Sequence, residues 1–545
     1  MGSNHPLSVR TERRMDKQEI RDKSSQDNSN ILLLEKGKRG ALNVIFGRTM
    51  LIVVLILAQI LLLFLAFRSF SDYTPYFYGA LMVFDGVMII HMVNKATNPT
   101  IKITWILLMV LAPPLGVFLY LFVEMDWGHR VLNRRLGRLI EETGALLPDR
   151  SEERARLKRE NPELGSLSQY VWNQGYFDTY RNTEVSYLPS GEKALEAILE
   201  ALDRAEKFIF LEFFIIDEGV MWGRVLKKLE EKVEQGVEVR VLYDGTCAIF
   251  RLPYRYPAMM EKLGIRCKMF SPLRPLVSTH YNNRDHRKIL VVDGKVAFTG
   301  GVNLADEYIN EKTLFGHWKD NGLMLRGEAV RSFTLMFLQM WNISEAGDSF
   351  DKYLSACISV PGAPGWVIPY GDSPLDKERV GEMVYMDIIN RAQRYVHIMT
   401  PYLILDGEML TALTFAAKRG VDVAIMLPHI PDKKYAFALA KTHYRELIEA
   451  GVRILEYTPG FVHAKVFVSD DIKAVVGTIN LDYRSLYLHF ECAAYLYDMP
   501  AVAEVERDFQ TTAKKCMEIR AKDLKHVSFL TRAAGWLLKV FAPLM

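Results

Sequence analysis

The sequence predicts an α/β fold made of two tandem copies of one unit, preceded by apolar segments that could cross a membrane. Three observations predict it: a motif that occurs twice, helices and strands that alternate in the same order in both halves, and long apolar runs near the N-terminus. The chain has 545 residues, enough for about two to four domains. Its formal net charge of +3 is too small to indicate a nucleic-acid partner, and none is expected.

The repeated motif joins a histidine, a lysine, an aspartate and an asparagine with the spacing H-x-K-x4-D-x6-G-[GT]-x-N. The residues of the two copies are His286, Lys288, Asp293 and Asn303, then His463, Lys465, Asp470 and Asn480. A histidine and a lysine two residues apart on an extended strand project from the same face, because side chains alternate along a strand. Each copy therefore offers an imidazole beside an ammonium group.

Each copy also predicts a β-hairpin. Asp293-Gly294 is a strong turn signal between two apolar, β-branched runs, and Asp470 occupies the equivalent position in the second copy. Both aspartates belong to the predicted catalytic motif, but we expect them to serve the turns rather than to contact a ligand. The returning strands end in glycine and a small residue, which lets backbone come close to a ligand.

These residue types suit attack on a phosphodiester. A neutral imidazole can be the nucleophile, a protonated one can be the general acid, and lysine and asparagine can bind the anionic oxygens. Two copies that face each other would supply the pair of histidines that double displacement requires. We therefore predict one active site built by both halves, which needs no metal or other cofactor.

Helix and strand patterns alternate in both halves. The predicted order of the first half is a helix at 194–205, a strand at 207–216, a helix at 222–235 and a strand at 237–243. The second half repeats this order at 377–394, 395–400, 407–419 and 421–427, followed by segments at 443–450 and 452–457. Such alternation predicts a mainly parallel sheet covered on both faces. The Pro- and Gly-containing stretch 360–369 is the natural boundary between the halves.

The N-terminal part predicts a polar arm and membrane helices. Residues 1–48 form a basic and polar arm that we expect to be disordered. Apolar stretches follow at 49–67, 76–93 and 103–123, against about 20 residues needed for one crossing. Pro113-Pro114 should interrupt the last stretch. We expect two to three transmembrane helices within 49–123, with a buried core helix as the alternative for each.

Two further segments are charged or amphipathic. Charged residues at helical spacing over 124–166 predict a connector near the membrane surface. The repeated domains are placed at 167–358 and 359–520. The C-terminal segment 521–545 combines apolar weight with scattered basic residues, which predicts an interfacial helix, with a short core helix as the alternative.

The paired motifs resemble those of the phospholipase D superfamily, and more narrowly the chain resembles the bacterial cardiolipin synthases. The runs that carry the resemblance are NPT at 98–100, NRDHRK at 283–288, NLADEY at 303–308, TPY at 400–402, GFVHAK at 460–465 and NLDYRS at 480–485. It extends from about residue 76 to the C-terminus. It implies an α/β fold with two tandem phospholipase D-like domains, each a mixed sheet flanked by helices, after N-terminal transmembrane helices.

The resemblance implies a membrane-bound phosphatidyltransferase that makes cardiolipin and glycerol from two phosphatidylglycerol molecules through a phosphatidyl-histidine intermediate. Phosphatidylglycerol would be both donor and acceptor, and the enzyme would be a multi-pass protein of the bacterial cell membrane. One alternative is a phospholipase D-type phosphodiesterase that hydrolyses phospholipid or nucleic acid. Another is a non-catalytic membrane scaffold, against which the intact motifs count. The oligomeric state and the membrane side of the site stay open.

The resemblance also implies roles for single residues. One motif histidine, for which we favour His286, would attack phosphorus, and the other would protonate the departing glycerol oxygen. The residues that would bind the phosphate oxygens are Lys288, Asn303, Lys465 and Asn480. An acidic residue behind each histidine would orient it. Glu491 has the family's position in the second half, eleven residues after Asn480. In the first half Leu314 stands at that offset, so Asp320 is the candidate there.

Overall fold

The computed structural model describes residues 74–113, 115–124, 127–253, 255–271, 283–343, 349–376, 378–526 and 529–544, with four single positions before them. The predicted arm over 1–48 and most of the predicted first span over 49–67 lie outside these residues.

The first half contains a seven-stranded mixed sheet with the order β1-β9-β7-β6-β2-β3-β4. The strands are β1 (Thr183–Leu188), β2 (Phe208–Phe213), β3 (Glu238–Asp244), β4 (Arg266–Phe270), β6 (Lys288–Val292), β7 (Val296–Gly300) and β9 (Gly322–Gly327). Strands β2, β3 and β4 are parallel, whereas the motif hairpin β6–β7 and strands β9 and β1 run antiparallel to their neighbours. The prediction of a mainly parallel sheet was therefore wrong, because the hairpins reverse the direction of the chain.

The second half repeats this arrangement with the order β10-β17-β16-β15-β11-β12-β13-β18. Its strands are β10 (Trp366–Asp372), β11 (Tyr395–Met399), β12 (Asp422–Pro428), β13 (Arg453–Tyr457), β15 (Val466–Ser469), β16 (Lys473–Gly477), β17 (His489–Tyr497) and β18 (Cys516–Ile519). The motif hairpin β15–β16 again lies beside the first strand of a parallel group. The strand orders of the two sheets thus confirm the internal duplication predicted from the sequence.

Helices cover the sheets, and alternate residues of each strand face opposite cores. The helices of the two halves are α9 (Gly191–Asp203), α10 (Val220–Glu234), α11 (Cys247–Phe250), α12 (Tyr256–Lys262), α13 (Val330–Asn342), α14 (Phe350–Leu354), α15 (Val380–Arg391), α16 (Gly407–Lys418), α17 (Lys434–Glu449), α18 (Tyr483–Tyr487) and α19 (Pro500–Ala513). Ile209 and Leu211 of β2 pack with residues of α9 and α10. Phe208 and Phe210 belong to a second core, which also contains residues of α13 and of the second sheet, so one core joins the two halves.

Two short strand pairs also connect the halves. Strand β5 (Arg284–Asp285) of the first half pairs with β17 of the second. Strand β8 (His317–Lys319) of the first half pairs with β14 (Gly460–Val462) of the second. Both pairs are parallel, and each lies next to one of the repeated motifs.

The helices that precede the first sheet pack onto both halves. They are α6 (Trp127–Gly144), α7 (Ser151–Glu160) and α8 (Pro162–Gly175). Leu136 of α6 belongs to the core between the sheets, and Leu157 and Leu164 belong to the core of the second half. The helices within the segment 124–166, which was predicted as a connector, are therefore part of the packed fold.

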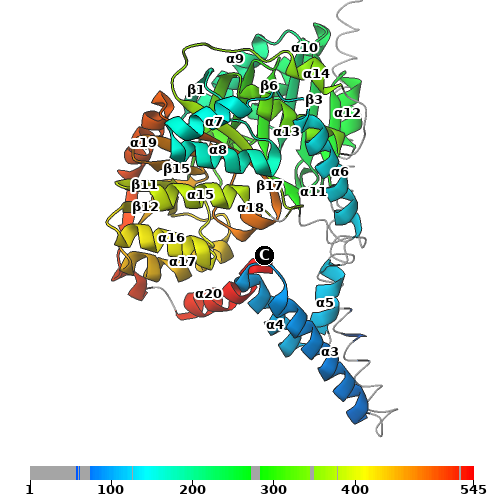
Figure 1. The fold of residues 1–545 in the computed structure, drawn as a ribbon, viewed down its shortest axis with the longest axis vertical. Helices are drawn as coiled ribbons and strands as arrows, with labels where there is room; N and C mark the ends of the chain where they lie inside the picture. The colour runs from blue at the N-terminus through cyan, green and yellow to red at the C-terminus, as the bar shows by residue number, and fades with distance from the viewer. Residues whose placement is uncertain are drawn as a thin grey trace, which may run out of the picture.

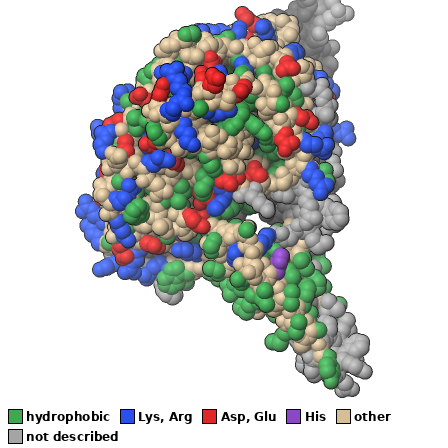
Figure 2. Space-filling model, viewed as in Figure 1, with side chains coloured by type: hydrophobic (Ala, Val, Ile, Leu, Met, Phe, Trp, Pro, Cys, Tyr) green, Lys and Arg blue, Asp and Glu red, His purple; other side chains and the backbone are tan. Residues whose placement is uncertain are grey.

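Helices α3 (Thr74–Asn94), α4 (Pro99–Leu111) and α5 (Leu115–Glu124) form an arm that projects from the two sheets (Figure 1). The interruption predicted at Pro113-Pro114 is confirmed, because α4 ends before it and α5 begins after it. Hydrophobic side chains gather over this arm (Figure 2), and Phe84, Val110 and Phe118 are exposed there. Within the described part of the chain, none of the helices has both the length and the apolar character that a membrane crossing demands.

The arm formed by helices α3, α4 and α5 is attached to the second half. Asn98 caps α4 by accepting from Thr100 N, and its amide nitrogen lies 3.0 Å from Asp406 Oδ2 and 2.8 Å from Tyr487 Oη. Helix α20 (Phe529–Phe541) lies along α17, and the hydroxyl of Thr104 in α4 donates to Val540 O at 2.7 Å. The N-terminal and C-terminal helices therefore meet on one side of the molecule.

Candidate active site

The cross-half strand pairs place each motif histidine beside a strand of the other half. His286 directly follows β5, and its backbone N–H donates to Phe490 O at 2.9 Å. His463 directly follows β14, and its backbone N–H donates to Lys319 O at 2.7 Å. Both side chains are buried, and both motifs contribute to one site.

Each histidine is hydrogen bonded to a carboxylate of the other half. His286 Nδ1 lies 2.8 Å from Glu491 Oε1, and His463 Nδ1 lies 2.7 Å from Asp320 Oδ2. Both carboxylates are fully buried. Sequence spacing linked Glu491 with the second motif and Asp320 with the first. In the structure each carboxylate instead contacts the histidine of the other motif. A carboxylate at Nδ1 fixes the proton there and leaves the Nε2 lone pair free.

The sheet register explains why Asp320 could not be located by its offset. In the first half Gly300 pairs with Gly322, and in the second half Gly477 pairs with Ala493. Asp320 and Glu491 each lie two residues before those partners, so they occupy equivalent positions. Asp320 nevertheless follows Asn303 by 17 residues, whereas Glu491 follows Asn480 by 11. The longer loop of the first half displaces the carboxylate in sequence but not in space.

The two carboxylates are held differently. The hydroxyl of Thr478 donates to Glu491 and accepts from Cys492 N at 3.0 Å. The equivalent residue in the first motif is Gly301, where an added Cβ would lie 1.9 Å from Asp320 Oδ1. A side chain at this position would displace Asp320, so the absence of one lets the shorter acidic residue reach His463.

Two lysine ammonium groups are buried in the same site. Lys288 Nζ donates to His286 O at 2.6 Å, and Lys465 Nζ donates to His463 O. Burial lowers the pKa of Lys288 to about 8. Burial, with repulsion from Lys288, lowers the pKa of Lys465 to about 7. Two buried ammonium groups that repel each other favour a bound anion, which would offset their burial and mutual repulsion.

Burial also keeps both imidazoles neutral. It lowers the pKa of His286 well below its usual value, assisted by Lys288. It lowers the pKa of His463 to about 4, together with Lys465 and against the attraction of Asp320. Burial would raise the pKa of Asp320, but attraction to His463 and hydrogen bonding lower it overall, so this carboxylate is ionised.

The motif asparagines follow the returning strands β7 and β16, and neighbouring groups form hydrogen bonds with their side-chain amides. Asn303 Nδ2 donates to Tyr308 Oη at 2.7 Å, and its Oδ1 accepts from Ile215 N at 3.0 Å. Asn480 Nδ2 donates to Ser485 Oγ at 3.0 Å. Each amide nitrogen carries two protons, and within the described part of the chain it makes one of these hydrogen bonds, which leaves the second proton for a ligand.

The motif aspartates lie at the opposite end of the hairpins from the histidines. Asp293 accepts from the backbone N–H groups of Glu206, Lys207 and Phe208 at 2.7–2.9 Å. Asp470 accepts in the same way from the backbone N–H groups of Gln393, Arg394 and Tyr395, which lead into β11. Their inclusion among the catalytic residues therefore needs correction, because they anchor the hairpins to the neighbouring strands.

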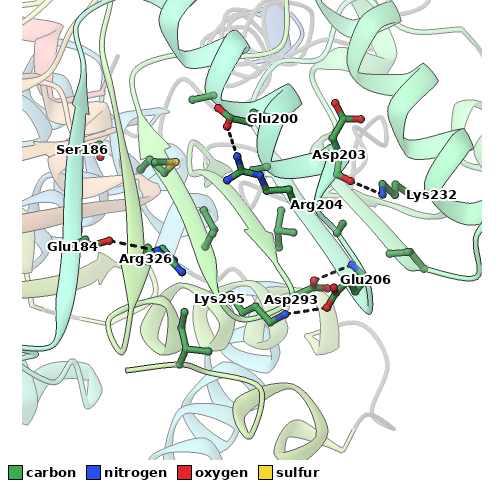
Figure 3. Close-up of a pocket in the computed structure, with 18 of the residues that line it drawn as sticks. Glu184, Ser186, Glu200, Asp203, Arg204, Glu206, Lys232, Asp293, Lys295 and Arg326 are labelled. Atoms are coloured by element: carbon green, nitrogen blue, oxygen red, sulfur yellow. Dashed lines mark hydrogen bonds and ion pairs between the residues drawn. The ribbon is translucent and has the colours of Figure 1, made fainter. Parts of the chain in front are cut away.

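A cavity of about 950 Å³ lies at this far end of the first sheet. Figure 3 shows Asp293 among the residues that line it, with Lys295 paired to Glu206 and Arg204 paired to Glu200. Its charged groups are thus engaged with one another. The cavity is separate from the paired histidines.

His489 is a residue of the site that the motif did not reveal. It lies two residues before Glu491 on β17, and its ring centroid is 5.4 Å from that of His286. Period-two alternation along β17 was the signal that could have found it, since residues 489 and 491 share a face.

Comparisons with known protein families agree with this site. A family model described as "Cardiolipin synthase, PLD-like domain" matches residues 198–341 and 385–513. A second model, described as "Phospholipase_D-nuclease N-terminal", matches residues 83–124. The first model covers each half of the duplication and both motifs.

Individual relatives agree as well. A cardiolipin synthase of Alkalihalophilus pseudofirmus is 33% identical over 470 residues, covering 85% of this chain and 92% of the relative. A Streptococcus mutans protein described as uncharacterized is 51% identical over 84% of this chain and 99% of its own length. The crystal structure of a phosphatidylserine synthase from Haemophilus influenzae shares the fold, with a TM-score of 0.54, 16% identity, and coverage of 70% of this chain and 98% of that one. The chain therefore belongs to the cardiolipin synthase family of enzymes with phospholipase D-like domains, which are phospholipid phosphatidyltransferases.

Proposed function

We propose that the protein converts two molecules of phosphatidylglycerol into cardiolipin and glycerol. The observation that carries the proposal is the pairing of each motif histidine with a buried carboxylate of the other half, in a chain of this family. Both imidazoles are oriented, and two buried ammonium groups lie beside them. Double displacement at one phosphorus needs these groups together.

The phosphodiester of the donor lipid binds between the two lysines. Lys288 and Lys465 supply positive charge, and the free amide protons of Asn303 and Asn480 donate to the non-bridging oxygens. These donors are fixed before the substrate arrives, so they stabilise the charge that develops on the phosphorus oxygens in the transition state. The bound anion also raises the pKa values of the neighbouring imidazoles, which favours one protonated histidine.

In the first step His286 Nε2 attacks phosphorus while the bond to the glycerol oxygen breaks. His463 gives its Nε2 proton to that oxygen, and glycerol leaves. We assign the acid role to His463 because the ionised Asp320 at its Nδ1 stabilises an imidazolium. The product is a phosphatidyl-histidine intermediate at His286.

In the second step a hydroxyl group of another phosphatidylglycerol loses its proton to His463 and attacks phosphorus. The bond between phosphorus and His286 breaks, and cardiolipin forms. The covalent intermediate conserves a high-energy bond to phosphorus, so the reaction needs no nucleotide. Water in place of the lipid alcohol would give phosphatidic acid, the product of a phospholipase D-type hydrolase.

We also propose that the protein is a multi-pass protein of the bacterial cell membrane, which supplies both substrates. The exposed apolar side chains of α3, α4 and α5 support this, as does α20 with Trp536 and Leu537 exposed beside them. The apolar stretch 49–67 is long enough for one crossing at about 20 residues. A lipid acceptor held at the interface competes with water through proximity, which can contribute roughly 7–11 kcal/mol.

The test is lipid analysis of the purified full-length protein in mixed micelles. With phosphatidylglycerol alone we expect cardiolipin and glycerol in equal amounts, unchanged by a chelator, and added glycerol should reverse the reaction. His286→Ala and His463→Ala should both be inactive, while His443→Ala, a buried histidine in α17, should keep its activity. Phosphatidic acid as the main product would establish the hydrolase instead. A requirement for phosphatidylethanolamine would change the donor, and a requirement for a cytidine-diphosphate lipid would overturn the mechanism.

A further inference from the structure

The two halves of the site differ at one pair of equivalent positions. Trp318 precedes Asp320 by two residues, as His489 precedes Glu491. The Trp318 ring packs 5.3 Å from that of His463, and its indole N–H donates to Asp320 Oδ2 at 3.4 Å. Trp318 therefore donates a side-chain hydrogen bond to Asp320 in one half-site. In the other half-site the hydroxyl of Thr478, and not His489, donates to Glu491.

His489 consequently has no partner for either ring nitrogen among the described residues. Its Nδ1 lies 3.7 Å from Glu491 Oε1, which is too far for a hydrogen bond. The residue is only 8% exposed. Buried polar atoms are almost always hydrogen bonded, and one that is not indicates a ligand, a water or a functional role. The ring lies against Phe214 and His286, so it borders the reacting groups.

The charges around His489 indicate the kind of ligand. Burial lowers its pKa well below the usual value, with repulsion from Arg484, Lys288 and Lys433 adding to the effect. The imidazole is therefore neutral and has one N–H to donate. His286, His489 and Glu491 have ligand atoms close enough together for a metal ion, but the surrounding lysines and arginines disfavour a cation there. They favour an anionic oxygen.

We propose that His489 is a further catalytic residue, which donates a hydrogen bond to a non-bridging oxygen of the phosphodiester under attack. This inference rests on the proposed function. His286 approaches phosphorus along the line of the leaving group, so a ring beside His286 faces the oxygens that lie around that line. Those oxygens gain negative charge as the bond to His286 forms, and a donor fixed in advance stabilises them.

The experiment combines variants of His489 with a sulfur-substituted substrate. His489→Phe keeps the ring shape without a donor, His489→Gln keeps a donor, and His443→Phe is the control, since His443 is also buried with an unpartnered ring nitrogen. Each variant is given phosphatidylglycerol and its two phosphorothioate diastereomers, in which one non-bridging oxygen is sulfur. Glycerol release is measured, and thermal melting checks the fold.

We expect His489→Phe to lower kcat about tenfold on phosphatidylglycerol, the loss of one good hydrogen bond, and His489→Gln to recover part of it. With wild type and His443→Phe, one diastereomer should react about tenfold more slowly than the other, and this ratio should fall in His489→Phe, because about one hydrogen bond's worth of discrimination is lost. A folded His489→Phe with wild-type kcat, or with the same sulfur effect as wild type, would overturn the proposal. Because glycerol is released in transfer and in hydrolysis alike, the result is independent of whether cardiolipin is the product.

Discussion

Asp320→Asn should nearly abolish turnover although Asp320 lies outside the repeated motif. The substitution keeps the size of the side chain and removes the charge that His463 Nδ1 contacts at 2.7 Å. A hydrogen bond to a charged group contributes about 1.5–3 kcal/mol, which corresponds to roughly 10–150-fold in rate. An amide can also turn its N–H₂ toward Nδ1 and select the wrong tautomer, and in a serine protease the equivalent change lowers kcat by about 10⁴. We therefore expect a decrease in kcat of between about 10² and 10⁴.

The control is Asp470→Asn, which changes an aspartate of the motif itself. Asp470 accepts from three backbone N–H groups, and its hydrogen bonds with the described residues include neither motif histidine. This variant should lose stability, measured as a lower melting temperature. Its kcat should stay within about threefold of wild type, a change of less than about 1 kcal/mol in the activation free energy, because Asp470 is not paired with a motif histidine. Both variants are assayed for glycerol release below their melting temperatures.

The opposite pattern would refute the reasoning. If a folded Asp320→Asn retained its kcat while a folded Asp470→Asn lost it, the motif aspartate would be the orienting group and the cross-half pairing would have no catalytic role. Equal losses in both folded variants would also contradict the assignment, since only one of the two carboxylates lies at a histidine.

Other measurements address the charge, packing and membrane attachment of the protein. The kcat/KM of the free enzyme should fall as pH rises through about 7 to 8, because Lys465 and Lys288 lose their protons there; a profile flat to pH 9 would contradict a role for the ammonium charges. Gly301→Ala should inactivate the enzyme by displacing Asp320, whereas Gly407→Ala, with open space around its Cβ, should not; an active Gly301→Ala would show that Asp320 can move without loss. Extraction from membranes should need detergent rather than high salt, and deleting residues 1–48 should leave activity intact; release by salt alone would argue against a spanning segment.

The sequence by itself determined the local features of this protein. The alternation of apolar residues located the helices and strands, since side-chain periodicity is a property of each segment alone. The predicted strand at 421–427, for example, is β12 (Asp422–Pro428). The matched spacing of His286 and His463 with their lysines identified two equivalent half-sites. The turn signals at Asp293 and Asp470 indicated structural roles for these residues, which their backbone contacts support.

Only the tertiary structure decided how the half-sites combine. His286 and Glu491 are 205 residues apart, and His463 and Asp320 are 143 apart, so no local pattern links them. Their pairing follows from strands β5 and β8, which leave the first half to pair with β17 and β14 of the second. The lack of a hydrogen-bond partner for His489 among the described residues is likewise visible only in three dimensions, because it depends on Thr478 already donating to Glu491. Periodicity is set by nearest neighbours in the chain, whereas these contacts are set by how the two sheets pack together.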